Sequence, residues 1–173
     1  MERIFKILIF TDLDGSLLNR DTFKFDEIKN YLRELISKGI FIIPNTSKTE
    51  EEILEFNNEL GSNLPFISEN GAAINGLNLL NSDLPKELIL SREKDNLLNM
   101  FKNIVPINLQ NKCMWASSME KKKQSLIFGL DDKKLNLALN RKYTIPFIFN
   151  GTKTEKNQLS KIIRKEGLFL QEG

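Results

Sequence analysis

A short apolar run that ends in two aspartates is the feature that most constrains this chain. Residues Ile7–Phe10 are all large and apolar, and Asp12, Asp14 and Gly15 follow them closely. A run of this length closed by a glycine turn predicts a buried parallel strand, and open α/β sheets bind ligands at the carboxyl ends of such strands. Alternate side chains of an extended segment point the same way, so both carboxylates can face one small site.

Paired carboxylates suit two kinds of chemistry. Their hard oxygen atoms are the ligands that Mg²⁺ prefers, and one aspartate can attack a substrate while the other moves protons. The alternative is a solvated Asp-Gly turn without function. The apolar strand before the pair, together with Leu17 and Leu18 after it, favours the functional interpretation, because a catalytic motif needs this strand-then-turn context.

Missing residue types exclude several other chemistries. The 173 residues include no His and only one Cys, Cys113. Without His there is no Ser-His-Asp triad, no Cys-His nucleophile and no His-ligated zinc. A single Cys forms no internal disulfide and no cysteine-cluster metal site. Hydrolytic chemistry would therefore depend on carboxylates, lysines and a hard metal ion.

Charge and hydropathy predict a protein that binds neither nucleic acid nor membranes. The net charge of +2 gives no electrostatic footprint for nucleic acid or an anionic membrane. No apolar run approaches the roughly 18 residues of a membrane span, and the N-terminus does not resemble a signal peptide. We therefore expect a cytoplasmic protein whose partner is a small molecule.

Strands and helices alternate in the first half of the chain. Asp26 is predicted to cap the first helix, and Thr49 with Glu52 forms the pattern of a capping box for the second. An order of β-α-β-α-β predicts parallel strands joined by right-handed crossovers. The expected strands are residues 4–10, residues 40–43 and a third that begins at Phe66.

Three short motifs carry a resemblance to a known family. Asp-Leu-Asp-Gly-Ser-Leu-Leu at 12–18 resembles motif I of the haloacid dehalogenase (HAD) superfamily of aspartate-nucleophile phosphatases. Thr-Ser-Lys-Thr at 46–49 and Glu-Asn-Gly at 69–71 resemble the mannosyl-3-phosphoglycerate phosphatases within it. The first of these two, at the position of motif II, is the more particular to that family.

The resemblance implies an α/β fold with a HAD-like Rossmannoid core and an inserted α/β cap domain. Residues 1–80 would be the N-terminal part of the core, with motifs I and II, and residues 81–173 the cap-like domain. In this second region the sequence fits either helix or strand at 120–130. It predicts helices near 93–104, 131–141 and 155–165, and strands at 144–149 and 168–170.

The resemblance also implies a Mg²⁺-dependent phosphomonoesterase that works through an aspartyl-phosphate. Asp12 would be the nucleophile, and Asp14 would protonate the leaving sugar oxygen and later activate water. Both residues would coordinate Mg²⁺, Asp12 through its carboxylate and Asp14 through its backbone carbonyl. The substrate would be a small phosphorylated sugar-glycerate, used in the synthesis of a hexosyl-glycerate compatible solute.

Further residues would bind phosphate or substrate by the same resemblance. Each has a structural alternative: capping of the following helix for the Thr-Ser pair, a solvated surface position for the Lys, and a simple turn for the Asn-Gly pair. The arginine precedes an aromatic residue and a Pro-Phe pair, and it could pair with the glycerate carboxylate. The candidate residues are Thr46, Ser47, Lys48, Glu69, Asn70, Gly71 and Arg141.

Two motifs of complete HAD phosphatases are not recognisable in this sequence. These are the motif III lysine and the motif IV acidic pair, and the region after Phe149 contains neither. The sequence therefore suggests a complementing C-terminal polypeptide, and the first strand would keep an exposed edge where further strands should pair. The alternatives are a phosphatase for sucrose phosphate or another sugar phosphate, or a catalytically incomplete fragment.

Overall fold

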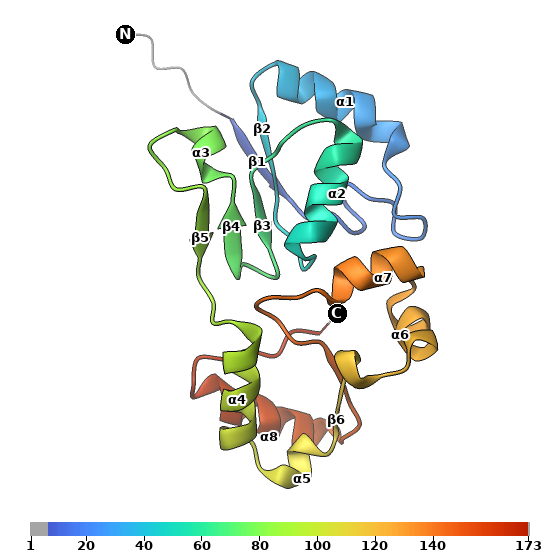
Figure 1. Cartoon of the computed structure of the whole chain (residues 1–173), viewed down its shortest axis with the longest axis vertical. Coiled ribbons are helices and arrows are strands. Elements are labelled where there is room, and N and C mark those ends of the chain that lie inside the picture. The colour runs from blue at the N-terminus through green and yellow to red at the C-terminus, as the bar shows by residue number, and fades with distance from the viewer. Residues whose placement is uncertain (1–6, 173) are drawn as a thin grey trace. The chain divides into compact units, whose positions relative to one another are not determined.

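The structure, a computed structural model, describes residues 7–172 and divides the chain after Ser91 into two compact units (Figure 1). Both units mix helices and strands, which confirms the α/β class. The elements of the first unit are β1 (Leu8–Thr11), α1 (Asp26–Ser37), β2 (Phe41–Pro44), α2 (Glu50–Leu60), β3 (Phe66–Ser68), β4 (Ala73–Asn75), α3 (Leu77–Leu80) and β5 (Glu87–Ile89).

Strands β1 and β2 form the predicted parallel pair, with Thr11 opposite Pro44. This register brings the carboxyl ends of both strands to the same edge of the sheet. Strand β3 joins β2 in parallel at a single bridge between Asn45 and Ile67, and it otherwise pairs antiparallel with β4, which pairs with β5. The expected three-stranded parallel core is thus confirmed for β1 and β2 but reduced to one bridge for β3.

Strand β1 has an unpaired apolar edge. Within the described residues β1 pairs only with β2, and Ile7, Leu8, Ile9 and Phe10 are 55%, 42%, 39% and 57% exposed. Parallel strands are ordinarily buried on both faces, so four adjacent exposed apolar side chains are unusual. The exposed edge expected from the sequence is therefore present at β1, whereas the prediction that this strand is buried is wrong for the described residues. The predicted strand residues 4–6 lie outside the described part of the chain.

The two helices of the first unit begin differently. The predicted capping box of α2 is confirmed, since Thr49 and Glu52 bond reciprocally, and Gly61 ends the helix with a φ of 72°. The predicted cap of α1 is wrong, because Phe25 occupies the N-cap position without a side-chain hydrogen bond and Asp26 is already helical. In the first turn of α1 the Asp26 carboxylate still stabilises the helix through its interaction with the positive end of the helix dipole.

The second unit packs helices around an antiparallel strand pair, β6 with β7. Its core includes Phe101, Leu109, Leu159 and Ile163. Its elements are α4 (Lys94–Ile104), α5 (Ile107–Gln110), β6 (Cys113–Trp115), a 3₁₀ turn (Ala116–Ser118), α6 (Lys121–Phe128), α7 (Asp132–Leu139), β7 (Phe147–Phe149) and α8 (Lys153–Arg164).

Most elements expected in the second region are present, while one open choice is decided and two expectations change. The ambiguous residues 120–130 form helix α6. Residues 168–170 form no strand, and Leu168 and Leu170 instead pack against the core of the unit. The first unit extends beyond residue 80, because β5 hydrogen-bonds to β4 and so belongs to its sheet.

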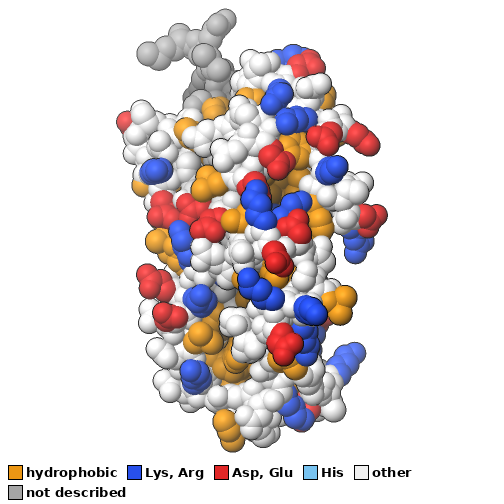
Figure 2. All heavy atoms as spheres, turned by 45° about the vertical axis from the view of Figure 1, so that its right-hand side comes forward, with side chains coloured by type: hydrophobic (Ala, Val, Ile, Leu, Met, Phe, Trp, Pro, Cys, Tyr) orange, Lys and Arg blue, Asp and Glu red, His pale blue; other side chains and the backbone are white. Residues whose placement is uncertain are grey.

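The surface drawn in Figure 2 carries acidic and basic side chains interspersed, without a broad area of one sign. Such mixing matches the small net charge of +2. Among residues 7–172, no helix has both the length and the apolar character needed to cross a membrane.

Candidate functional site

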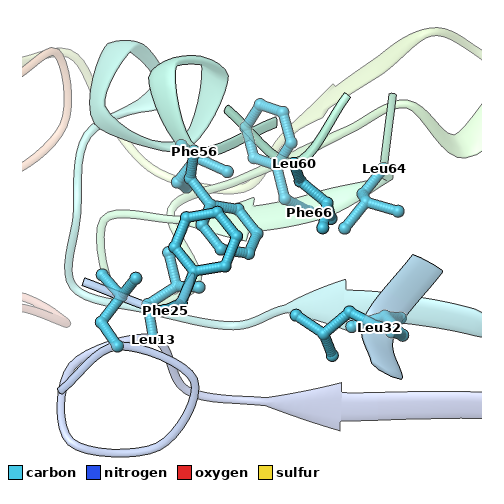
Figure 3. Close-up of a cluster of buried hydrophobic side chains, with 10 residues drawn as sticks. Leu13, Phe25, Leu32, Phe56, Leu60, Leu64 and Phe66 are labelled. Atoms are coloured by element: carbon cyan, nitrogen blue, oxygen red, sulfur yellow. The ribbon is translucent and has the colours of Figure 1, made fainter. Parts of the chain in front are cut away.

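Leu13 anchors the loop that follows β1. Its side chain is fully buried in the core of the first unit, beside Phe25 in Figure 3, while Asp12 and Asp14 on either side are exposed. The turn is closed by the Leu18 N–H, which donates to the Leu13 carbonyl at 2.8 Å, and Gly15 takes a φ of 73°. One buried leucine thus holds two carboxylates at the surface.

Asp12 is oriented by its neighbours in the chain. Its Oδ1 accepts a hydrogen bond from the Leu13 N–H at 2.8 Å, and its backbone carbonyl accepts from Thr11 Oγ1 at 3.0 Å. A carboxylate held by a backbone N–H has fewer rotamers to lose when it reacts.

The loop after β2 lies beside the loop after β1. The Asn45 N–H donates to the Thr11 carbonyl at 2.8 Å, which ties the two strand ends together. Thr46 is 4% exposed, and its Oγ1 accepts from the Lys48 N–H at 3.3 Å. Ser47 is exposed. Helix α2 then starts at its capping box, and its N-terminal end favours anions.

Lys48 joins the two loops through its side chain. Its Nζ lies 3.1 Å from Asp14 Oδ1 and 3.3 Å from Glu52 Oε1, and its side chain is only 12% exposed. The solvated-surface alternative for Lys48 is therefore excluded. The structure brings two of the predicted site residues, Asp14 and Lys48, into direct contact.

The third predicted loop is strained and attached to the second. Glu69, Asn70 and Gly71 all have positive φ, at 47°, 61° and 91°. The Glu69 N–H donates to the Lys48 carbonyl at 2.9 Å and the Asn70 N–H to the Thr46 carbonyl at 3.0 Å. Strained backbone persists where the surroundings hold it, and it is frequent at functional sites. Glu69 is only 3% exposed.

Arg141 lies in the second unit, in the segment that follows α7. Its Nε donates to the Ala138 carbonyl at 3.0 Å and its Nη1 to Thr144 Oγ1 at 2.9 Å. The side chain is half-buried, so part of the guanidinium serves to hold this segment to the end of α7.

The two aspartates fit a hard metal ion as a minimal donor set. Asp12 and Asp14 are both exposed and offer the oxygen ligands that Mg²⁺ takes. Among residues 7–172 no three acidic, Cys or His side chains are grouped so as to hold a metal. The remaining ligands of a Mg²⁺ ion bound here would come from water, from substrate oxygens or from groups outside residues 7–172.

Two residues beside the site were not predicted as part of it. Glu52 was assigned only to the helix cap, although its i, i+4 spacing from Lys48 is the signal for an ion pair on a helix. Phe23, whose ring centroid lies 5.4 Å from Lys48 Nζ, gave no such signal. It is placed there by the loop between β1 and α1.

A protein family and one of the relatives match nearly the whole chain. The haloacid dehalogenase-like hydrolase family matches residues 9–167. A glucosyl-3-phosphoglycerate/mannosyl-3-phosphoglycerate phosphatase of Persephonella marina is 32% identical, with 96% of this chain and 64% of that protein aligned. A protein of the same name from Methanococcoides burtonii is 48% identical over 69 residues, which are 40% of this chain and 25% of that protein. The chain thus spans less than two thirds of these relatives' length.

Solved structures share the fold at low sequence identity. One from Thermoplasma acidophilum aligns with a TM-score of 0.60 at 15% identity, over 96% of this chain and 60% of its own. A haloacid dehalogenase-like hydrolase from Bacteroides thetaiotaomicron aligns with a TM-score of 0.58 at 17% identity, over 97% of this chain and 68% of that protein. With a family match that extends from motif I to beyond α8, the chain belongs to the haloacid dehalogenase-like hydrolases.

Proposed function

We propose that this chain carries the phosphoryl-transfer site of a Mg²⁺-dependent phosphomonoesterase for hexosyl-3-phosphoglycerates. The observation that carries the proposal is the junction of the two loops, where Asp14 of the first contacts Lys48 of the second beside the N-terminus of α2. The substrate class is inferred from the relatives in Persephonella marina and Methanococcoides burtonii, whose names state it.

In this mechanism the two aspartates divide the chemistry. A carboxylate oxygen of Asp12 attacks phosphorus, and the bond from phosphorus to the sugar-glycerate oxygen breaks while Asp14 gives that oxygen its proton. The products are the free alcohol and an aspartyl-phosphate. Water then attacks phosphorus and loses a proton to Asp14, which releases inorganic phosphate and restores both carboxyl groups.

The neighbouring loops would hold the phosphate and the sugar. Thr46 and Ser47 lie at the N-terminal end of α2, where backbone N–H groups and the helix dipole favour an anion. Mg²⁺ held by Asp12 and Asp14 would neutralise negative charge at the phosphoryl group. Glu69, Asn70 and Gly71 would lie on the sugar side, and Arg141 of the second unit would pair with the glycerate carboxylate.

A complementing polypeptide is part of the proposal. A motif III lysine and a motif IV acidic pair would have to come from it. The first unit, residues 1–91, would be its counterpart in the core, and the second unit, residues 92–173, would be the cap. The exposed apolar side chains of Ile7–Phe10, which lie in and immediately before β1, are the surface that such a polypeptide would cover, because parallel strands are normally buried on both faces.

The test is turnover of mannosyl- and glucosyl-3-phosphoglycerate with Mg²⁺, with and without a polypeptide equivalent to the unmatched third of the relatives. We expect the chain alone to be at least about 10²–10³-fold slower than the complemented form, because it lacks charged groups that normally stabilise the transition state. Absence of turnover in both arms would overturn the proposed activity.

Asp12→Asn is the decisive variant. The amide cannot serve as a carboxylate nucleophile, so turnover should fall by at least roughly 10⁴-fold. Asp21→Asn is the matched control, since Asp21 is another exposed aspartate in the segment between β1 and α1. Equal rates for Asp12→Asn and the unaltered protein would remove Asp12 from the mechanism.

A further inference from the structure

Lys48 is unusually enclosed for a lysine. Its side chain is 12% exposed, between Asp14 and Glu52, and its ammonium group lies 5.4 Å from the ring centroid of Phe23. Lysines are almost never buried unless they are paired. A cation held by two carboxylates and an aromatic face is committed to these partners, whereas a substrate-binding lysine would need to turn toward the ligand.

The backbone of Lys48 is held on both sides as well. Its N–H donates to Thr46 Oγ1 at 3.3 Å, and its carbonyl accepts from the Glu69 N–H at 2.9 Å. Lys48 is therefore fixed at its backbone before its side chain makes any contact. The geometry of the ammonium group is set by the fold of all three loops.

Glu52 is oriented by the cap of α2. Its Oε2 accepts from the Thr49 N–H at 2.9 Å and from Thr49 Oγ1 at 3.2 Å, which leaves Oε1 for Lys48. Phe23 is held in a φ of 55° by the loop before α1, where its N–H donates to the Asn19 carbonyl at 2.8 Å. A positive φ is an outlier for a bulky residue, and such strain is frequent at functional sites.

We propose that Lys48 is a positioning residue for Asp14, and that it does not bind the substrate directly. By holding Oδ1 of Asp14, Lys48 leaves Oδ2 to exchange the proton with the leaving oxygen and with water. Glu52 and Phe23 keep Lys48 in place for this task. The inference rests on the proposed function, because it assigns Lys48 to the general acid–base of that reaction.

The test compares two substrates in the Lys48→Met variant, assayed in the complemented protein. A sugar phosphate needs a proton on its leaving oxygen, whereas p-nitrophenyl phosphate releases a stable phenolate without one. We expect kcat to fall roughly 10- to 10²-fold on the sugar phosphate and less than about threefold on the aryl phosphate, with little change in KM. The ratio of the two rates does not depend on how much of the variant is folded.

Lys112→Met is the matched control. Lys112 also pairs with the glutamate of a capping box, at 2.6 Å from Glu155 Oε1, but it lies in the second unit, and its ion pair among the described residues is with Glu155 alone. Its ratio of rates should equal that of the unaltered protein. An equal loss on both substrates in Lys48→Met, or a rise in KM with kcat unchanged, would overturn the positioning role and leave the proposed function standing.

A chemical rescue separates the charge from the packing. In Lys48→Cys, alkylation of the introduced thiol with 2-bromoethylamine rebuilds an ammonium group at nearly the original reach, and it should restore most of the lost rate on the sugar phosphate. Cys113 is buried, and burial raises the pKa of its thiol to about 11, so it should react slowly. Alkylation that leaves the ratio of rates unchanged would count against the proposal. If the unaltered protein turns over neither substrate, the proposed function fails and the role of Lys48 fails with it.

Discussion

Helices α2 and α8 begin with the same device and use it differently. Each has a Thr-x-x-Glu capping box, with Thr49 and Glu52 in the first unit and Thr152 and Glu155 in the second. In each, a lysine pairs with the glutamate. The two N-termini therefore form a natural comparison, in which the capping residues are the same while the surroundings change.

The two lysines differ in what else they reach. Lys48 is next to its cap in sequence and also contacts Asp14, and its pair with Glu52 is 12% and 11% exposed. Lys112 immediately precedes β6 and forms an ion pair only with Glu155 among the described residues, and the pair is 35% and 26% exposed. Both capping boxes thus stabilise a helix N-terminus. The box of α2 is also part of a candidate site, because the lysine that pairs with its glutamate contacts Asp14 as well.

Removal of the cap hydroxyl should have the largest effect on this comparison. Thr49 is 1% exposed and Thr152 is exposed, so Thr49→Ala should cost about 1–2 kcal/mol in the free energy of unfolding and Thr152→Ala about 0.5–1 kcal/mol. Trp115, the only tryptophan, reports the second unit. Urea unfolding followed by its fluorescence should shift only for Thr152→Ala, and far-UV circular dichroism should reveal the shift for Thr49→Ala. Equal costs at both sites would show that burial does not distinguish them.

Removal of the negative charge of the capping glutamate alone should have a smaller effect on stability. Gln can replace Glu in a capping box, so Glu52→Gln keeps the cap and leaves Lys48 with Asp14 as its one carboxylate partner. Because this pair is mostly buried, we expect a loss of about 1 kcal/mol in stability. Turnover of the sugar phosphate should fall further than that of p-nitrophenyl phosphate. Glu155→Gln should change neither the turnover of the sugar phosphate nor its ratio to the turnover of p-nitrophenyl phosphate. A similar change in both variants would show that the two capping boxes do not differ in function.

The smallest effect should come from protonation of the capping glutamate Glu155 at low pH. The hydrogen bond from Lys112, aided by Thr152, lowers the pKa of Glu155 from 4.5 to about 2. A carboxyl whose pKa is lower in the folded state stabilises the fold above its unfolded pKa, and this stabilisation is lost as pH falls toward the folded value. The difference in Trp115-detected unfolding between the unaltered protein and Glu155→Gln should therefore shrink from about pH 5 to about pH 2. A difference that is constant over this range would contradict the pair's role. Since both side chains are partly exposed, salt should weaken the effect.

Local patterns accounted for much of the fold and part of the site. The capping box at Thr49, the end of α2 at Gly61 and the strand that leads into Asp12 all follow from residues within a few positions of one another. The expected cap at Asp26 was wrong because an acidic residue is favoured both at the cap and in the first turn. The sequence does not distinguish these two positions by residue type alone.

Pairing between distant segments was the weaker part of the prediction. The apolar run of β3 is compatible with a parallel or an antiparallel neighbour, and it pairs antiparallel with β4 over its whole length while touching β2 at one bridge. Residues 168–170 have the composition of a strand, yet they form no strand, and Leu168 and Leu170 pack half-buried against the core of the second unit. An apolar segment satisfies either arrangement until the surrounding elements are placed.

The sequence by itself determined where the strand before Asp12 ends, that α2 begins with a cap, and which residue types are available for chemistry. Each follows from side chains and backbone groups that lie close along the chain. Only the tertiary structure decided that Lys48 meets Asp14. Their contact requires β1 and β2 to lie side by side in parallel, with Thr11 opposite Pro44, so that the loops after both strands share one edge. That register depends on how two segments distant in sequence pack together, so the residues around Asp14 or around Lys48 alone do not specify it.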